Sequence, residues 1–226
     1  MLRAIVFDFD GVIANSEPLH FRAFHDILLG QGVRLDEAEY YERYLGYDDL
    51  GVFRAVGTER GMKWTGEDVA GFVARKAVEL ESLERNGAVL FPGAEAAIRR
   101  MAAGVPLAIA SGALGAEIRR VLDRTHLTPC FRTIVSAEDT PASKPAPDPY
   151  LRAVALLSAH LHEPLAAGDC VAIEDSRWGL ESAKAAGLRT VGVTHTYEAA
   201  ALGNADLIIP SLGELDLTRL ERLCGN

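Results

Sequence analysis

Short apolar runs recur along the chain without the strict alternation that marks a strand with one solvent-facing side. Five or six of these runs, rich in Val, Ile, Leu and Ala, are expected to be strands: residues 4–9, 105–110, 133–136, 170–174, 190–193 and 207–209. Continuous apolar runs of this length are typical of strands that are covered on both faces, as in parallel sheets. The pattern therefore predicts a buried parallel sheet.

Helical stretches alternate with these runs. Helices are predicted over residues 94–102, 114–126, 149–159, 177–186 and 215–223. Asp148 followed by Pro149 is a typical helix start, and Ser176 and Gly187 are suited to begin and end the helix after the fourth run. Strands that alternate with helices imply right-handed crossovers. The expected fold class is therefore α/β, with a doubly wound parallel sheet and a Rossmann-like core.

The alternation stops between residues 16 and 87, where the sequence contains no convincing strand. Helices are predicted instead over residues 17–29, 36–44, 50–60 and 67–85. Ser16 with Pro18 marks the first helix start, and Asn86-Gly87 marks a turn at the far end. A connection of about 70 residues with helices of its own is typical of a cap domain rather than of a loop. We therefore expect a core of residues 1–15 and 88–226 and an inserted all-helical cap domain of residues 16–87.

Length and charge narrow the function classes. A chain of 226 residues accommodates one large domain or a domain with an insert, as this layout requires. The 23 Lys and Arg residues against 32 Asp and Glu residues give a net charge of −9, which disfavours a nucleic-acid partner. A small phosphorylated ligand remains compatible with this net charge, because such a ligand responds to the local electrostatic field of a cleft rather than to the charge of the whole protein. The composition is compatible with a monomer or a weak homodimer.

Neither membrane attachment nor a disulfide framework is expected. No apolar run approaches the roughly 18–20 residues that cross a bilayer. Asp8 and Asp10 interrupt the start of the chain before the apolar segment of a signal peptide could form. The cysteines are Cys130, Cys170 and Cys224, an odd number without a Cys-x-x-Cys pair. They predict reduced thiols, and together these features favour a cytoplasmic protein.

Carboxylate, hydroxyl and amine groups follow the predicted strands. They belong to Asp8-Phe9-Asp10-Gly11-Val12 after the first strand, Ser111-Gly112 after the second, Ser143-Lys144-Pro145 in the loop before the fourth, and Glu174-Asp175-Ser176 at the end of the fourth. Ligands of open parallel sheets bind beyond the carboxyl ends of the strands, so these groups are expected at one edge. Four carboxylates in one cleft repel one another and favour a bound cation. Oxygen ligands together with a substrate phosphate are typical of Mg²⁺.

These four motifs, in this order, resemble those of the haloacid dehalogenase superfamily. The resemblance covers essentially the whole chain and includes a helical cap after the first motif, as in the branch of phosphoglycolate phosphatases and β-phosphoglucomutases. The segments Ser143-Lys144-Pro145-Ala146-Pro147-Asp148 and Ile173-Glu174-Asp175-Ser176-x-x-Gly179 are especially similar to that branch. The four motifs are specific for the superfamily and do not indicate a substrate.

The resemblance implies catalytic and phosphate-binding roles. Asp8 would be the nucleophile that forms an aspartyl-phosphate, and Asp10 would be the general acid and base. Ser111, Gly112 and the backbone amides that come next would bind phosphate oxygens at a helix start. Lys144 would neutralise the charge between the nucleophile and the phosphoryl group.

The resemblance also implies a Mg²⁺ site as the cofactor site. Asp8, the backbone carbonyl of Asp10 and Asp175 would be its ligands. Glu174 would contribute either directly or through a water molecule. The expected function is therefore a Mg²⁺-dependent phosphatase that hydrolyses the phosphomonoester of a small metabolite.

The closest alternative is a phosphosugar mutase of the β-phosphoglucomutase type. The segment His20-Phe21-Arg22-Ala23 resembles those enzymes. However, Leu45-Gly46-Tyr47-Asp48-Asp49 has an acid where the mutases carry a phosphate-binding Arg, and residues 111–115 lack the Ser and Asn that follow the second motif there. A mutase must hold two phosphates, so these departures favour a phosphatase.

Three further alternatives are less favoured. A phospho-receiver domain needs only about 120 residues and carries no insert. A 2-haloacid dehalogenase needs neither Mg²⁺ nor an acid at Asp10 to protonate a leaving alcohol. A non-catalytic homologue kept for protein binding would not need every motif residue, and all of them are present.

Four residues of the predicted cap are candidates for substrate contact: His20, Tyr47, Arg75 and Lys76. His20 lies in the first cap helix, near the expected hinge. Arg75 and Lys76 offer charges for the distal end of a substrate, and Tyr47 offers a ring. For each of them, packing or solvation of a helix within the cap is the alternative interpretation.

Overall fold

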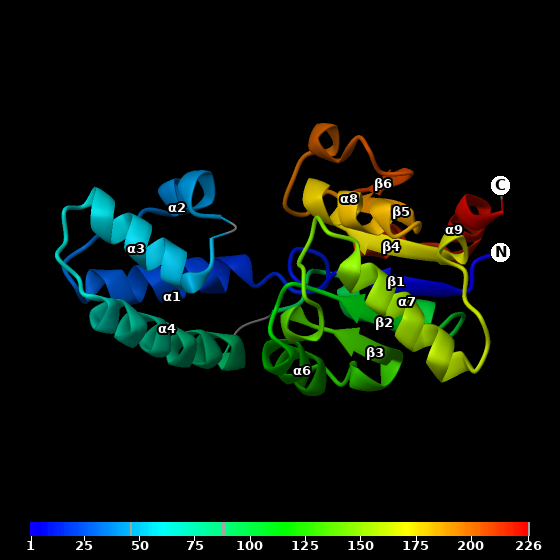
Figure 1. Ribbon diagram of the computed structural model, residues 1–226, viewed down its shortest axis with the longest axis horizontal. Helices are drawn as coiled ribbons and strands as arrows, with labels where there is room; N and C mark the ends of the chain where they lie inside the picture. Colours follow the sequence, from blue (N-terminus) through cyan, green and yellow to red (C-terminus); the bar gives the residue numbers. More distant parts are fainter. Residues whose placement is uncertain (46, 87–88, 226) are drawn as a thin grey trace. The chain divides into compact units, whose positions relative to one another are not determined.

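The computed structural model describes residues 1–45, 47–86 and 89–225 (Figure 1). The chain divides into two compact units, one of Met1–Asn15 with Val89–Asn226 and one of Ser16–Ala88. We call them the core unit and the helical unit. The predicted start of the second core segment, residue 88, lies outside the described residues.

The core unit is built on a parallel sheet. In the described part of the chain the sheet has six strands in the order β3-β2-β1-β4-β5-β6, and every neighbouring pair is parallel. The strands are β1 (Ala4–Phe7), β2 (Leu107–Ala110), β3 (Phe131–Val135), β4 (Cys170–Glu174), β5 (Arg189–Val193) and β6 (Leu207–Ile209). The order reverses beside β1, as in a doubly wound sheet. The predicted fold class is confirmed.

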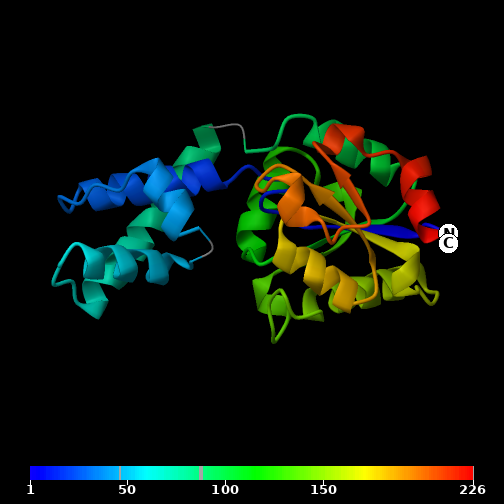
Figure 2. The same ribbon diagram turned by 90° about the horizontal axis from the view of Figure 1, so that it is seen from above.

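Helices cover both faces of this sheet. They are α5 (Ala94–Ala102), α6 (Gly115–Arg124), α7 (Asp148–Leu161), α8 (Arg177–Ala185) and α9 (Leu217–Cys224). Helices α7 and α8 pack on the face formed by alternate residues of the central strands, which include Ala4, Val6, Ala108, Ala110 and Ala172. Figure 2 shows α9 on the opposite side of the sheet. Small Ala side chains on the first face let α7 approach the strands closely.

Several boundaries differ from the predicted ones. Strand β1 ends at Phe7, two residues earlier than expected, because the chain enters a turn after Asp8. Asp148 lies in the first turn of α7 instead of capping it, and Pro147 takes the capping position. Ser176 does cap α8, since its side chain accepts a hydrogen bond from the Gly179 amide. These shifts leave the order of the elements unchanged.

The helical unit contains only helices among its described residues. They are α1 (Glu17–Leu29), α2 (Glu37–Arg43), α3 (Asp49–Glu59) and α4 (Gly66–Asn86). Aromatic side chains form much of its core, among them Phe24, Tyr40, Tyr44, Phe53 and Phe72. An inserted all-helical unit after β1 was expected from the break in strand periodicity, and the structure confirms it.

The chain leaves and re-enters the core unit at adjacent points. The Asn15 amide donates to the Val89 carbonyl over 2.6 Å, and the Phe91 amide donates to the Ile13 carbonyl over 3.1 Å. The two connecting segments therefore run side by side within the core unit. None of the described helices is long and apolar enough to cross a membrane.

Candidate active site

The three central strands bring the motif residues to one edge of the sheet. Phe7 at the end of β1 is level with Ile109 in β2 and Ile173 in β4. Asp8 follows β1 directly, and Ser111 directly follows β2. Strand β4 ends at Glu174, and Asp175 comes next. The register of the three strands thus places these side chains together at the carboxyl ends of the strands, where ligands of parallel sheets bind.

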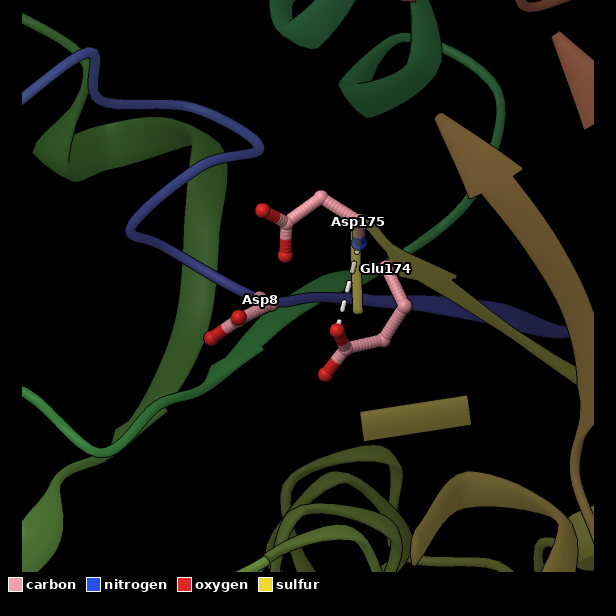
Figure 3. Close-up of side chains that lie close together, drawn as sticks. All are labelled: Asp8, Glu174 and Asp175. Carbon is pink, nitrogen blue, oxygen red and sulfur yellow. Dashed lines mark hydrogen bonds between the residues drawn. The ribbon is translucent and has the colours of Figure 1, made fainter. Parts of the chain in front are cut away.

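Three carboxylates form the centre of this edge (Figure 3). Asp8, Glu174 and Asp175 each offer one oxygen, and these oxygens lie within 4.8 Å of one another. All three side chains are buried. Asp10 lies half-buried on the turn after β1, and its carboxylate does not belong to this group. The structure therefore brings together the three side chains predicted to bind the metal, whereas the ligand predicted from Asp10 is its backbone carbonyl.

Burial makes two of these carboxylates, those of Asp8 and Asp175, hard to ionise without a cation. Burial raises the pKa of Asp8 well above its usual value, Lys144 opposes the shift, and the two other carboxylates add to it. Burial, and then Glu174, raise the pKa of Asp175 to about 7. An oxygen-only donor set under mutual repulsion fits a hard divalent cation such as Mg²⁺. The residues present could therefore hold the ion that the motif resemblance implies.

Lys144 is the cation that the chain itself supplies. Its Nζ lies 2.8 Å from Asp8 Oδ1 and 2.6 Å from Glu174 Oε1. Burial works against its charge, but Asp8 and Glu174 outweigh that effect and raise the pKa of Lys144. The ammonium therefore stays charged between two buried carboxylates.

Tyr150 is a neighbour of this site that the sequence analysis missed. It is fully buried in the first turn of α7, and its hydroxyl donates to Glu174 Oε1 over 2.7 Å. A tyrosine among apolar helix positions gives no signal of its partner, which lies 24 residues away in the chain. Its proximity to Lys144, six residues earlier, was the only hint available.

Ser111 and Gly112 lie at the start of the segment that leads into α6. Ser111 is buried, and its Oγ accepts a hydrogen bond from the Ala113 amide over 3.1 Å. A side chain at Gly112 would meet no atom within 4 Å, so this backbone borders open space. Helix α6 begins at Gly115, and amides at a helix start attract anions. The Gly115 amide already donates to Glu138 Oε2 over 2.8 Å, so the backbone at Gly112 is the better candidate for a phosphate contact.

The loop after β5 also reaches the carboxylates, and the sequence analysis missed it as well. The side chain of Thr196 forms a hydrogen bond with Asp175. His195 Nδ1 lies 3.1 Å from the Gly11 carbonyl oxygen. Gly11 has a φ of +73°, and a Cβ there would lie 1.9 Å from Asp175 Oδ2. The signal that could have found His195 and Thr196 is their place just beyond the carboxyl end of a predicted strand, the same place that Asp8 and Ser111 occupy.

Four residues of the helical unit were predicted as candidates for substrate contact, and two of them, His20 and Lys76, contact each other. Lys76 is buried, and its Nζ lies 2.8 Å from Asp49 Oδ1 and 3.0 Å from His20 Nδ1. Arg75 instead lies over the ring of Phe72, 5.2 Å from its centroid. Tyr47 is exposed and contacts Tyr44.

The chain is similar to known proteins over most of its length. The family model of haloacid dehalogenase-like hydrolases matches residues 5–193. Protein CbbY of Rhodobacter capsulatus is 34% identical over 93% of this chain and 94% of its own. Hexitol phosphatase B of Escherichia coli is 32% identical over 84% of this chain and 82% of its own.

Solved structures agree with these sequence matches. CbbY from Rhodobacter sphaeroides in complex with phosphate is 27% identical, with a TM-score of 0.80 over 98% of this chain and 100% of that chain. A variant of the same protein with xylulose-(1,5)bisphosphate has a TM-score of 0.75 at 27% identity, over 95% of this chain and 96% of that chain. The match over most of the chain confirms the resemblance that the four motifs carried: the protein is an enzyme of the haloacid dehalogenase-like hydrolase family.

Proposed function

We propose that this protein is a Mg²⁺-dependent phosphatase that hydrolyses a small-metabolite phosphomonoester through a phosphoryl group on Asp8. The observation that carries the proposal is the position of Lys144 Nζ, 2.8 Å from Asp8 Oδ1 and 2.6 Å from Glu174 Oε1, beside the third carboxylate. A nucleophilic carboxylate held against a fixed cation is what phosphoryl transfer requires. Bound Mg²⁺ would supply further positive charge to the phosphate oxygens.

The first chemical step transfers the phosphoryl group to the protein. An Asp8 carboxylate oxygen attacks phosphorus, and the bond between phosphorus and the substrate oxygen breaks. Asp10 donates a proton to that oxygen, so the product leaves as an alcohol. Lys144 offsets the charge between the carboxylate and the phosphoryl group.

The second step returns the protein to its starting state. Asp10 accepts a proton from a water molecule, the water oxygen attacks phosphorus, and the bond to Asp8 breaks. Inorganic phosphate is released. Ser111 and the amides before α6 hold the phosphate oxygens during both steps, and Gly112 leaves room for them.

The charges within the helical unit favour hydrolysis over mutase chemistry. A mutase must bind a second phosphate, which requires a cation free to meet it. Lys76 is buried and its charge is met by Asp49 at 2.8 Å. Asp49 also belongs to the segment Leu45-Gly46-Tyr47-Asp48-Asp49, which has an acid where the mutases carry an Arg. The relatives include a hexitol phosphatase and a protein seen with a sugar bisphosphate, which supports a phosphorylated sugar or sugar alcohol as the substrate.

Phosphate release from a panel of sugar, polyol and carboxylic acid phosphates tests this proposal. We expect Mg²⁺-dependent release that EDTA abolishes. Asp8→Asn should lower the rate to background, whereas Asp123→Asn, at an exposed position of α6, should retain it. Conversion of β-glucose 1-phosphate to glucose 6-phosphate without phosphate release would contradict hydrolysis and indicate a mutase.

A further inference from the structure

Glu174 Oε1 accepts hydrogen bonds from two different side chains of one segment. Lys144 Nζ donates to it over 2.6 Å, and the hydroxyl of Tyr150 donates over 2.7 Å. Tyr150 is fully buried, so its hydroxyl has no access to water as an alternative partner. The loop before α7 and the first turn of α7 therefore supply both donors to this oxygen.

The second oxygen of Glu174 is also held by the protein. Oε2 accepts from the Asp175 amide at 3.2 Å, drawn as the dashed line in Figure 3, and from the Ser176 hydroxyl at 3.3 Å. The carboxylate fills the space beside Gly179, where a Cβ would lie 1.9 Å from it. Glu174 is thus fully buried with hydrogen-bond donors on both oxygens, and these donors offset the cost of removing its carboxylate from water.

The terminal torsion of a glutamate has no strong intrinsic preference. The direction of the Glu174 carboxylate is therefore set by its donors. Two groups donate to Oε1. Lys144 is the one whose ammonium group needs a fixed place. Tyr150 is held separately, because its ring packs in the apolar core between the sheet and its covering helices. The ring of Tyr150 also faces the ammonium group, with Nζ 5.2 Å from its centroid.

We propose that Tyr150 is a positioning residue whose hydroxyl fixes Glu174 Oε1, so that this oxygen holds Lys144 Nζ against Asp8. Glu174 then serves Lys144 rather than acting as a direct ligand of the cation. The proposal rests on the proposed phosphatase function and names the residue that sets the charge next to the nucleophile. Without the hydroxyl, the Glu174 carboxylate turns, and the ammonium group loses its fixed place.

Tyr150→Phe tests the hydroxyl alone, because it keeps the ring. The matched control is Tyr44→Phe in the helical unit, where another fully buried tyrosine donates to a glutamate, Glu59, over 2.6 Å. We expect Tyr150→Phe to lower kcat about 10- to 100-fold with KM changed less than about threefold, as for a misplaced catalytic group. Tyr44→Phe should keep the wild-type kcat. An equal kcat for Tyr150→Phe and Tyr44→Phe overturns the proposal.

Calorimetric titration with Mg²⁺, without substrate, separates the two possible roles of Glu174. If Glu174 serves Lys144, Tyr150→Phe keeps the Mg²⁺ Kd within about threefold of wild type, whereas Asp175→Asn raises it about tenfold or more. A comparable rise in Tyr150→Phe would show that the hydroxyl acts through a metal ligand and would contradict the proposal.

A crystal structure of Tyr150→Phe tests the positioning step without any turnover. We expect Lys144 Nζ to lie more than about 3.5 Å from Asp8 Oδ1, beyond hydrogen-bond distance. An unchanged 2.8 Å contact overturns the inference. Absence of phosphatase activity in the wild-type protein would instead remove the proposed function, and the crystal structure would still decide the role of Tyr150.

Discussion

Lys144 is the residue that balances the buried charges of the core unit. Its Nζ contacts both Asp8 and Glu174, and each of those carboxylates is removed from water. Buried carboxylates without a partner are strongly unfavourable, so the same ammonium group contributes to stability and to the proposed reaction. Removing it should therefore affect both.

Lys144→Met should lower kcat by about 100- to 1,000-fold, because a charge next to the proposed nucleophile, Asp8, is lost. It should also lower the free energy of unfolding by about 3 kcal/mol, because two buried carboxylates lose their partner. Steady-state kinetics and urea unfolding measure the two effects. Lys184→Met is the control, since Lys184 is partly exposed and lies 3.6 Å from Asp206. A Lys144→Met protein that matches this control in both measurements would refute the assigned role.

At the scale of elements, helix α8 illustrates how a site requirement overrides helix propensity. Gly179 lies inside this helix, where Ala is normally better by about 1 kcal/mol. The Glu174 carboxylate occupies the place of its missing side chain, at 1.9 Å from a Cβ. Gly71 in α4 is also helical, but a Cβ there meets no atom within 4 Å.

The two glycines should therefore respond to Ala with opposite signs. Gly179→Ala should lower the unfolding free energy and kcat, because Glu174 must move. Gly71→Ala should raise the unfolding free energy by about 0.5–1 kcal/mol and leave kcat unchanged. Urea unfolding and kinetics on both variants check this, and stabilisation by Gly179→Ala would show that the Glu174 position is misassigned.

The helical unit carries a half-buried histidine, His20, that should destabilise it at low pH. Burial, and then Lys76 of α4, lower the pKa of His20 to about 3 from its usual 6.5. The other ionisable groups of this cluster are Asp49 on α3 and Glu17 with Tyr40 from α1 and α2. The folded state binds fewer protons at His20 than the unfolded chain between these two pKa values.

Unfolding free energy should accordingly be lost as pH falls below about 6.5, at up to about 1.4 kcal/mol per pH unit. Burial raises the pKa of Glu17, and its opposite contribution begins above its usual value of 4.5 as the pH falls and is complete below that value. The difference between wild type and His20→Gln from pH 7 to pH 5 isolates the histidine. Identical slopes for the two proteins over that range would contradict the assignment.

Sequence patterns predicted the helices and strands better than the side-chain contacts between residues far apart in the chain. The strand runs along the chain could be inferred because burial on both faces leaves a continuous apolar signature, and the helical insert because that signature stops. Asp8, Ser111, Glu174 and Asp175 could be placed because they lie at or directly after strand ends. The pairing of Lys76 with Asp49, 27 residues apart, could not, since helix packing and not the local pattern decides it. The hydrogen bond from Tyr150 escaped for the same reason.

At the scale of the whole molecule, the net charge of −9 conceals a strongly uneven distribution. Three carboxylates are buried within 4.8 Å of one another in the core unit. Their repulsion is present in the folded protein and absent in the unfolded chain, so a cation at this point should stabilise the fold.

Mg²⁺ should therefore raise the melting temperature, with a gain of about 2.7 kcal/mol at a concentration 100 times its Kd. Scanning calorimetry with Mg²⁺, with EDTA, and with NaCl at matched ionic strength measures the effect. Asp175→Asn should remove most of the difference between Mg²⁺ and NaCl. An equal response of wild type to the two salts would argue against a cation at these carboxylates.

The central claim is that Asp8 carries the phosphoryl group during turnover. The most direct measurement is acid quenching within one turnover, followed by mass spectrometry of the peptide that contains Asp8. With a hydrolysed substrate and Mg²⁺, we expect a transient phosphoryl group on Asp8 that disappears as phosphate is released. The phosphoryl role of Asp8 would be wrong if turnover ran at the full wild-type rate with no phosphorylated Asp8 at any quench time, and ran equally fast in Asp8→Asn.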